Sequence, residues 1–148
     1  DVDLVTIEAG PNDWTEITLG QVGDIGDDTF LGNLRQCYEY LTEHTRARVV
    51  SNCISNSNDN GGKPFYKNQF GYTYRDYMNG VRELSKYYGI TNIDVAGDLL
   101  GWGRKTADLL KDHIHYTELG GAVVGEFIWN KLKLVEPFPR FTKEEASL

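Results

Sequence analysis

Clustered basic residues are absent from this sequence, and their absence excludes one class of partner. The chain of 148 residues contains 15 Lys and Arg against 22 Asp and Glu, which gives a formal net charge of −7. Proteins that bind nucleic acid neutralise its phosphates with grouped Lys and Arg side chains. No such stripe occurs along the chain, so we expect no nucleic-acid partner.

Long apolar runs are missing as well. A membrane-spanning helix needs roughly 18 or more consecutive apolar residues, and no segment of this chain approaches that length. We therefore expect no membrane partner. The hydrophobic share of 40% and the charged share of 25% are ordinary for a globular domain. The length suits one domain or a large piece of one.

Cysteine is scarce, with only Cys37 and Cys53. Cys37 falls on the apolar face of a predicted helix, and Cys53 lies near the end of a predicted strand. We interpret both as reduced core thiols rather than as a disulfide or a catalytic thiol.

Hydrophobic periodicity predicts strands and helices that alternate along the chain. The predicted strands cover residues 3–8, 48–54 and 91–95, and the predicted helices cover residues 28–45, 72–88 and 117–133, with a short helix at 106–110. Asp27 or Asp28 is expected to cap the first helix, and Thr117 the last. This alternation predicts an α/β protein with a parallel sheet and helices on both faces.

The sequence also leads to expectations about the first strand, the last helix and the C-terminal tail. The strand at 3–8 (DLVTIE) has few polar residues, so we expect it to be buried with neighbours on both sides. The N-terminus is then a cut through a sheet. We expect a domain portion at 1–135 and an extended tail at 136–148. The buried face of the last helix is expected to contain Gly121, Val124, Gly125, Ile128 and Leu132.

A first candidate site follows the first predicted strand, at Gly10-Pro11-Asn12-Asp13-Trp14. The loop at the carboxyl end of a parallel strand faces the ligand crevice of an α/β sheet. An Asn amide at such a place can donate a hydrogen bond to a developing oxyanion. The alternative is a plain turn, because Pro-Asn-Asp is also good turn chemistry.

A second candidate site, Asp112-His113-Ile114-His115, precedes the last predicted helix. An Asp three residues before a His can bond Nδ1 of the imidazole, which leaves Nε2 to act as a general base. Asp112 could instead only satisfy loop amides. A third alternative is a metal held by His113 and His115, but a closed site needs further ligands and the only other His is His44.

Together the two motifs resemble the SGNH, or GDSL-type, hydrolases. A strand followed by G-x-N-D, and D-x-x-H before the final helix, occur in the order and spacing of that family, and the resemblance covers roughly residues 1–134. It implies a three-layer α/β/α flavodoxin-like fold. It also implies that Asn12 is an oxyanion-hole donor, that Asp112 orients the general base His115, and that Asp13 braces its loop.

The nucleophile of that family is not found in this chain. The family's Ser lies in a G-D-S motif after its first strand, and a Gly donor follows the second strand. Both precede the G-x-N-D motif, at which this chain begins. The serines present are Ser51, Ser55, Ser57, Ser85 and Ser147, none of them in such a motif. We therefore expect the Ser to come from a missing N-terminal half, and expect that half or a second copy as a partner.

The resemblance implies hydrolysis of an ester, such as an acyl group on a carbohydrate or another small polar molecule, without a metal or organic cofactor. Gly10, Asp13, Trp14 and Ser55 are expected to line the substrate. Rings at Trp14, Phe65, Tyr66 and Trp102 suit sugar faces, although covering the edge of the core is the alternative. The competing hypothesis for the whole chain is a non-catalytic carbohydrate-binding remnant of the same fold.

Overall fold

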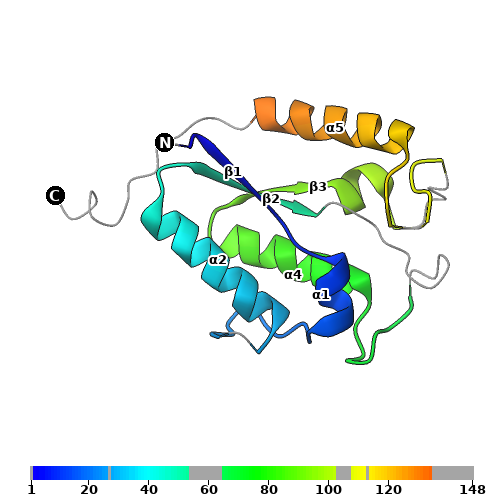
Figure 1. Ribbon diagram of the computed structural model, residues 1–148. Coiled ribbons are helices and arrows are strands. Elements are labelled where there is room, and N and C mark those ends of the chain that lie inside the picture. Colours follow the sequence, from blue (N-terminus) through cyan, green and yellow to red (C-terminus); the bar gives the residue numbers. More distant parts are fainter. Residues whose placement is uncertain (1, 27, 54–64, 103–107, 113, 135–148) are drawn as a thin grey trace.

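A three-stranded parallel sheet forms the centre of the computed structural model, which describes residues 2–26, 28–53, 65–102, 108–112 and 114–134. The strands are β1 (Leu4–Glu8), β2 (Arg48–Cys53) and β3 (Thr91–Asp94), in the order β1-β2-β3 (Figure 1). Both pairings are parallel. The predicted α/β class with a parallel sheet is confirmed.

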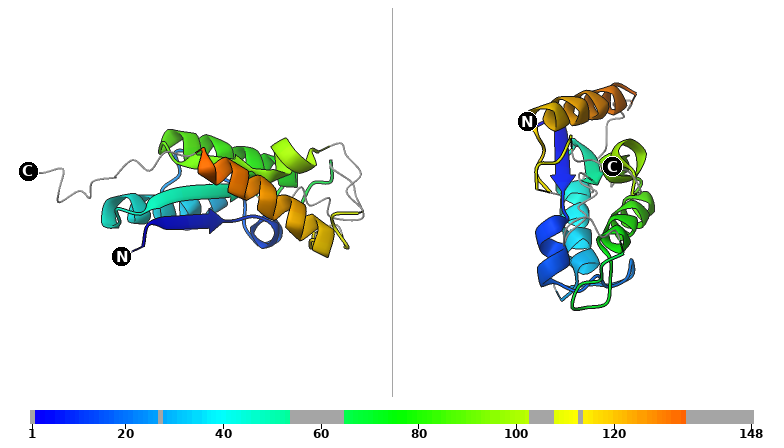
Figure 2. Two further views of the ribbon diagram at one scale, coloured as in Figure 1. Left: turned by 90° about the horizontal axis from the view of Figure 1, so that it is seen from above. Right: turned by 90° about the vertical axis from the view of Figure 1, so that its right-hand side faces the viewer.

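Helices cover both faces of this sheet (Figures 1 and 2). They are α1 (Pro11–Glu16), α2 (Phe30–His44), α4 (Tyr74–Tyr87), the π-helix η1 (Val95–Leu100) and α5 (Glu118–Lys133). Helices α2 and α4 lie on one face, and α5 lies on the other. The core is divided accordingly, with Val49 and Cys53 in the α2/α4 cluster and Val50 in the cluster beneath α5.

Hydroxyl side chains cap three of the helices. Thr117 accepts a hydrogen bond from the Gly120 amide at 3.0 Å, as the sequence predicted for α5. The predicted cap of α2 was wrong, because Thr29 accepts from the Gly32 amide at 3.1 Å and Asp28 is exposed. Asp27 lies outside the described residues. Thr29 and Asp28 are both good capping residues, and only the exact point at which the helix begins decides between them.

Strand β1 is more exposed than its sequence predicted. Its side chains alternate between exposed and half-buried, and Leu4 is 39% exposed. Among the described residues, β2 is the only strand that pairs with it. Its outer edge is therefore open within this part of the chain, and the expectation that further strands bury it stays a prediction.

Two expectations about burial are corrected. Cys37 is exposed on α2, whereas Cys53 is buried as predicted. On α5, Val124 is buried, but Gly121 and Gly125 are exposed and Gly120 takes the inner position. A Cβ on Gly120 would lie 2.0 Å from the Leu109 carbonyl oxygen, so only glycine lets the helix approach that backbone.

Some expectations fall outside the described part of the chain. Residues 103–107, which include the start of the predicted short helix, and the tail beyond 134 are not described. Residues 108–110 form a turn and a β-bridge rather than a helix. No helix in the described segments is both long and apolar enough to cross a bilayer.

A buried hydroxyl network joins the sheet to both helices on its α2/α4 face. The Tyr38 hydroxyl donates to Ser51 Oγ on β2 at 2.7 Å and lies 2.9 Å from Ser85 Oγ on α4. All three side chains are at most 1% exposed. Because water cannot replace a lost partner there, the network ties α2, β2 and α4 together.

Tyr38→Phe should therefore lower the free energy of unfolding by about 1–3 kcal/mol, the usual cost of leaving buried polar groups without a partner. Urea unfolding measures this. Tyr40→Phe is the matched control, because Tyr40 lies on the same helix and is 66% exposed. Equal stability of the two variants would contradict the role given to the network.

Candidate functional site

A closed loop before α5 holds the second sequence motif. Leu110 and Tyr116 form an antiparallel bridge across it. The Lys111 amide donates to the His115 carbonyl at 2.9 Å, and the Thr117 amide donates to the Leu109 carbonyl at 2.8 Å. These backbone hydrogen bonds fix the two sides of the loop, so the backbone that carries its side chains is held in place.

Asp112 and His115 meet at the tip of this loop. His115 Nδ1 lies 2.7 Å from Asp112 Oδ2, which confirms the predicted contact. The other carboxylate oxygen, Oδ1, accepts from the His115 amide at 2.7 Å and from the Ile114 amide at 3.3 Å. A neutral ring that donates its Nδ1 proton to this carboxylate carries its basic lone pair on Nε2.

These hydrogen bonds also hold the carboxylate in its charged form. The pKa of Asp112 falls to about 2, mainly because the His115 amide donates to the carboxylate and then because the His115 ring does. The side chains of His115 and Asp112 are 68% and 51% exposed. A charged, oriented Asp beside a reachable imidazole is the arrangement that an acid–base pair requires.

The metal alternative gains no support within the described residues. No group of three or more His, Cys, Asp or Glu side chains there is placed to hold a metal ion. His44 lies at the end of α2, and His113 lies outside the described residues.

The first motif forms the short helix α1 directly after β1. Asn12 is exposed, and its side-chain amide has no hydrogen-bond partner within the described residues. Asp13 Oδ2 accepts from the Gly10 amide at 3.0 Å, so Asp13 braces the turn as expected rather than presenting itself to a substrate. Gly10 is buried, and a Cβ there would lie 2.5 Å from the Tyr74 hydroxyl. Gly10 therefore provides room for Tyr74, and the substrate contact expected of it stays a prediction.

The aromatic residues of the sequence divide into core and surface. Trp14 is only 3% exposed, and its indole Nε1 donates to the Tyr72 carbonyl at 3.1 Å, so the expectation of a substrate contact is corrected. Trp102 packs against Tyr74, with ring centroids 6.1 Å apart. Phe65 is 82% exposed and Tyr66 is 45% exposed, and these two rings remain accessible.

The described serines are poor nucleophiles. Ser51 and Ser85 are buried in the Tyr38 network on the α2/α4 face. Ser55, Ser57 and Ser147 lie outside the described residues, so the substrate role expected of Ser55 stays a prediction.

Both motifs lie at the same end of the sheet. Helix α1 follows the carboxyl end of β1, and the loop before α5 lies toward the carboxyl ends of the parallel strands (Figure 1). This is the edge at which open α/β sheets bind ligands.

Sequence reasoning missed three residues at this edge. Asn52, Tyr74 and Tyr116 each carry a buried side-chain oxygen without a hydrogen-bond partner in the described chain. The sequence could have singled out Asn52, because it is a polar residue inside the apolar strand RVVSNC. No sequence pattern could have singled out the two tyrosines, since a Tyr at a helical or loop position predicts only packing.

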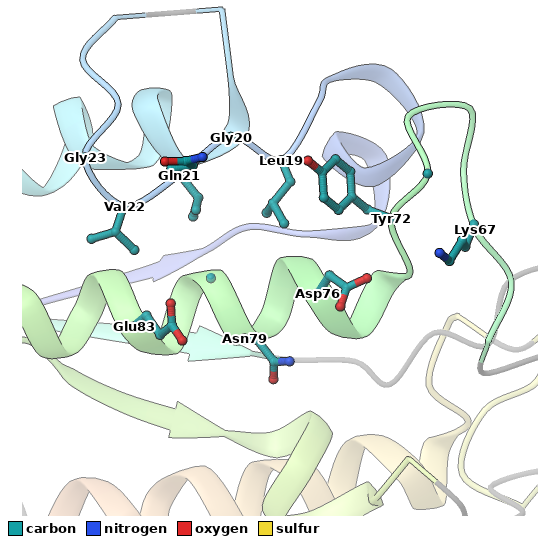
Figure 3. A pocket seen from close by; sticks show the side chains of 13 residues that line it. Leu19, Gly20, Gln21, Val22, Gly23, Lys67, Tyr72, Asp76, Asn79 and Glu83 are labelled. Atoms are coloured by element: carbon teal, nitrogen blue, oxygen red, sulfur yellow. The ribbon is translucent and has the colours of Figure 1, made fainter.

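A separate open groove of about 710 Å³ lies between the loop at residues 19–23 and α4 (Figure 3). Its polar lining includes Gln21, Lys67, Asp76, Asn79 and Glu83. Asp76 is already engaged, since it accepts from the Thr73 amide at 2.7 Å. The groove contains neither Asn12 nor His115 and is distinct from the candidate site.

Comparisons with known proteins reveal the fold alone. No family model and no curated protein matches the chain. A crystal structure of a protein from Lactobacillus plantarum, solved by a structural genomics consortium, matches with a TM-score of 0.80 and 22% identity, covering 92% of this chain and 69% of that one. A second crystal structure matches with a TM-score of 0.74 and 20% identity, covering 90% and 65%. The chain is thus an α/β protein with a parallel sheet, consistent with a flavodoxin-like fold.

The Asp112 carboxyl should titrate with a pKa of about 2, against an ordinary value of 3.8. Because the folded pKa is depressed, the contact stabilises the fold above the ordinary pKa, and that contribution is lost as the pH falls through about 2. Carboxyl carbon shifts followed by NMR measure this. In His115→Ala the pKa should rise toward 3.8 but stay below it, because the backbone amides still donate. An ordinary pKa in the unaltered protein would contradict the contact.

Proposed function

We propose that this chain is the C-terminal portion of an SGNH-type ester hydrolase. The observation that carries the proposal is the Asp112–His115 pair, held at 2.7 Å with the same carboxylate fixed by two backbone amides. A His oriented in this way is the general base that activates a Ser nucleophile in acyl transfer. The exposure of both side chains is compatible with such a role.

Asn12 supplies the second part of the machinery in this proposal. It follows β1 at the carboxyl edge, it is exposed, and its amide has no partner within the described residues. A free amide donor at this edge suits the oxyanion that develops when a nucleophile attacks an ester carbonyl. Asp13 keeps the turn in place through the Gly10 amide, so that Asn12 is presented by a braced backbone.

The nucleophilic Ser comes, in this proposal, from a part of the protein beyond these 148 residues. The sequence has no G-D-S motif. The outer edge of β1 is open within the described chain, and Leu4 is 39% exposed beside it. An open apolar edge is suited to a further strand. The two similar solved structures are also longer than this chain, which covers 69% and 65% of them.

The proposed reaction has two halves, acylation and deacylation, and in each of them His115 takes up one proton and gives it back. The Ser oxygen attacks the ester carbonyl while His115 Nε2 takes its proton, and Asn12 donates to the oxyanion. Collapse of the intermediate expels the alcohol, which receives that proton from His115. Water then attacks the acyl-enzyme while the same nitrogen takes its proton, and His115 returns that proton to the Ser oxygen as the acid leaves.

His115→Ala in the intact protein should lower kcat for p-nitrophenyl acetate by roughly 10⁴–10⁶-fold, and Asp112→Asn by roughly 10⁴-fold, as in other triads. His44→Ala is the matched control, because His44 is an exposed His at the end of α2. Equal rates for His115→Ala and His44→Ala would refute the proposal.

The source of the nucleophile is tested separately with a fluorophosphonate probe. Peptide mapping should find the label on a Ser outside these 148 residues, and labelling should require His115. A label on Ser55 or Ser57 would place the nucleophile in this chain and overturn that part of the proposal alone.

Asn12→Ala should lower kcat by roughly 10²–10³-fold with little change in KM, because an oxyanion donor acts mainly in the transition state. Asn33→Ala on α2 serves as a control for the loss of an Asn side chain. An effect confined to KM would show that Asn12 binds substrate and does not stabilise the oxyanion.

A further inference from the structure

The short helix α1 is held in place by a hairpin that lies far along the chain. Helix α1 has six residues, fewer than the roughly 12–15 that an isolated helix needs to persist in water. The last carbonyls of a helix also lack partners within that helix. Side chains of the hairpin at residues 67–73, which a bridge between Lys67 and Thr73 closes, supply such partners. Because α1 carries Asn12, the contacts that hold this helix also place the Asn12 amide.

Asn68 is the centre of this attachment. Its Nδ2 donates to the Trp14 carbonyl of α1 at 2.6 Å and to the Tyr77 hydroxyl of α4 at 3.2 Å. Its Oδ1 accepts from the Phe70 and Tyr72 amides of the hairpin, both at 3.0 Å. Two N–H donors and two lone pairs on the oxygen are all that an Asn side chain offers. Every one of them is used, so the side chain fits in one orientation, with its nitrogen facing α1.

Two neighbouring hydrogen bonds attach the same helix to the same hairpin. The Tyr72 carbonyl accepts from the Trp14 indole at 3.1 Å and from the Asn68 backbone amide at 2.9 Å. Gln69 Nε2 donates to the Thr15 carbonyl at 2.7 Å. Gln69 is exposed and Asn68 is half-buried, so water replaces the bond of Gln69 more readily than that of Asn68.

The position of Asn12 depends on the backbone of α1. Its side-chain amide has no hydrogen-bond partner within the described residues, and its own carbonyl accepts from the Thr15 hydroxyl at 2.8 Å. An oxyanion donor must lie about 2.7–3.1 Å from the developing charge. A displacement of about 1 Å can lower the rate roughly 10²-fold. A residue that fixes α1 therefore controls how well Asn12 can act.

We propose that Asn68 is a positioning residue for the oxyanion donor Asn12. Asn68 acts through the Trp14 carbonyl and the backbone of α1, and it contacts no reacting atom. The inference rests on the proposed function, because that function gives Asn12 its role as a donor. It assigns a part in the chemical step to a residue that lies outside both sequence motifs and 54 residues from the carbonyl it binds.

Asn68→Asp in the intact protein tests this directly. The variant has the same shape and keeps the oxygen that accepts from the hairpin amides, but it replaces the donor to the Trp14 carbonyl with an oxygen. It should lower kcat for p-nitrophenyl acetate by roughly 10–100-fold with little change in KM. In the Asn12→Ala background the same substitution should change kcat by less than about twofold, because the donor that it displaces is already gone. Asn130→Asp is the matched control, since Asn130 is exposed on α5.

Gln69→Glu gives the result if Asn68→Asp does not fold. It removes the donor to the Thr15 carbonyl from an exposed position. It should lower kcat by roughly 2–10-fold, the range that one hydrogen bond contributes, and again only while Asn12 is present. Losses of equal size with and without Asn12 would overturn the inference, because they would show that the hairpin only supports the fold. An unchanged kcat would overturn it as well.

Hydrogen exchange of the Trp14 amide separates this inference from the proposed function. That amide donates to the Gly10 carbonyl within the first turn of α1 at 3.0 Å, and its protection should fall at least roughly 10-fold in Asn68→Asp. Unchanged protection would overturn the inference even in an active enzyme. If the intact protein shows no hydrolysis that depends on His115, the proposed function fails. A loss of protection would then still support Asn68 as the residue that fixes the helix carrying Asn12.

Discussion

The central strand β2 is the constraint on which the rest of the structure depends. It pairs with β1 on one side and with β3 on the other. Val49 and Cys53 enter the α2/α4 core, whereas Val50 enters the core beneath α5. A shift of one residue in register would exchange these sets, so the two cores together fix the register. The same register places Asn52 beside Glu8, at the edge where both motifs lie.

Acidic side chains shape the loops around this sheet, which gives the net charge of −7 a structural meaning. Each of several carboxylates accepts a hydrogen bond from a backbone amide three residues away: Asp13 from Gly10, Asp24 from Gln21, Asp76 from Thr73, Asp94 from Gly97 and Asp112 from His115. Of these, Asp112 also holds an imidazole ring. The candidate acid–base pair is therefore the same hydrogen bond between an Asp carboxylate and a nearby backbone amide, with a His side chain bound to the carboxylate as well.

The sequence predicted much of the fold and the local part of the candidate site. The positions of all three strands were close to those observed, because alternating and continuous apolar patterns predict strands directly. The cap of α5 at Thr117 and the contact between Asp112 and His115 were also predicted, since groups three residues apart meet through a single turn. The cap of α2 was missed, because neighbouring Asp28 and Thr29 have similar capping ability.

What the sequence determined by itself was therefore local: the strands, the helices, and the Asp112–His115 contact. Only the tertiary structure decided that Trp14 is buried, because its indole bonds to the Tyr72 carbonyl 58 residues away. It likewise decided that Asn52, Tyr74 and Tyr116 lie unpartnered at one edge of the described chain. Such groups come from distant segments, and only the packing of sheet and helices brings them together.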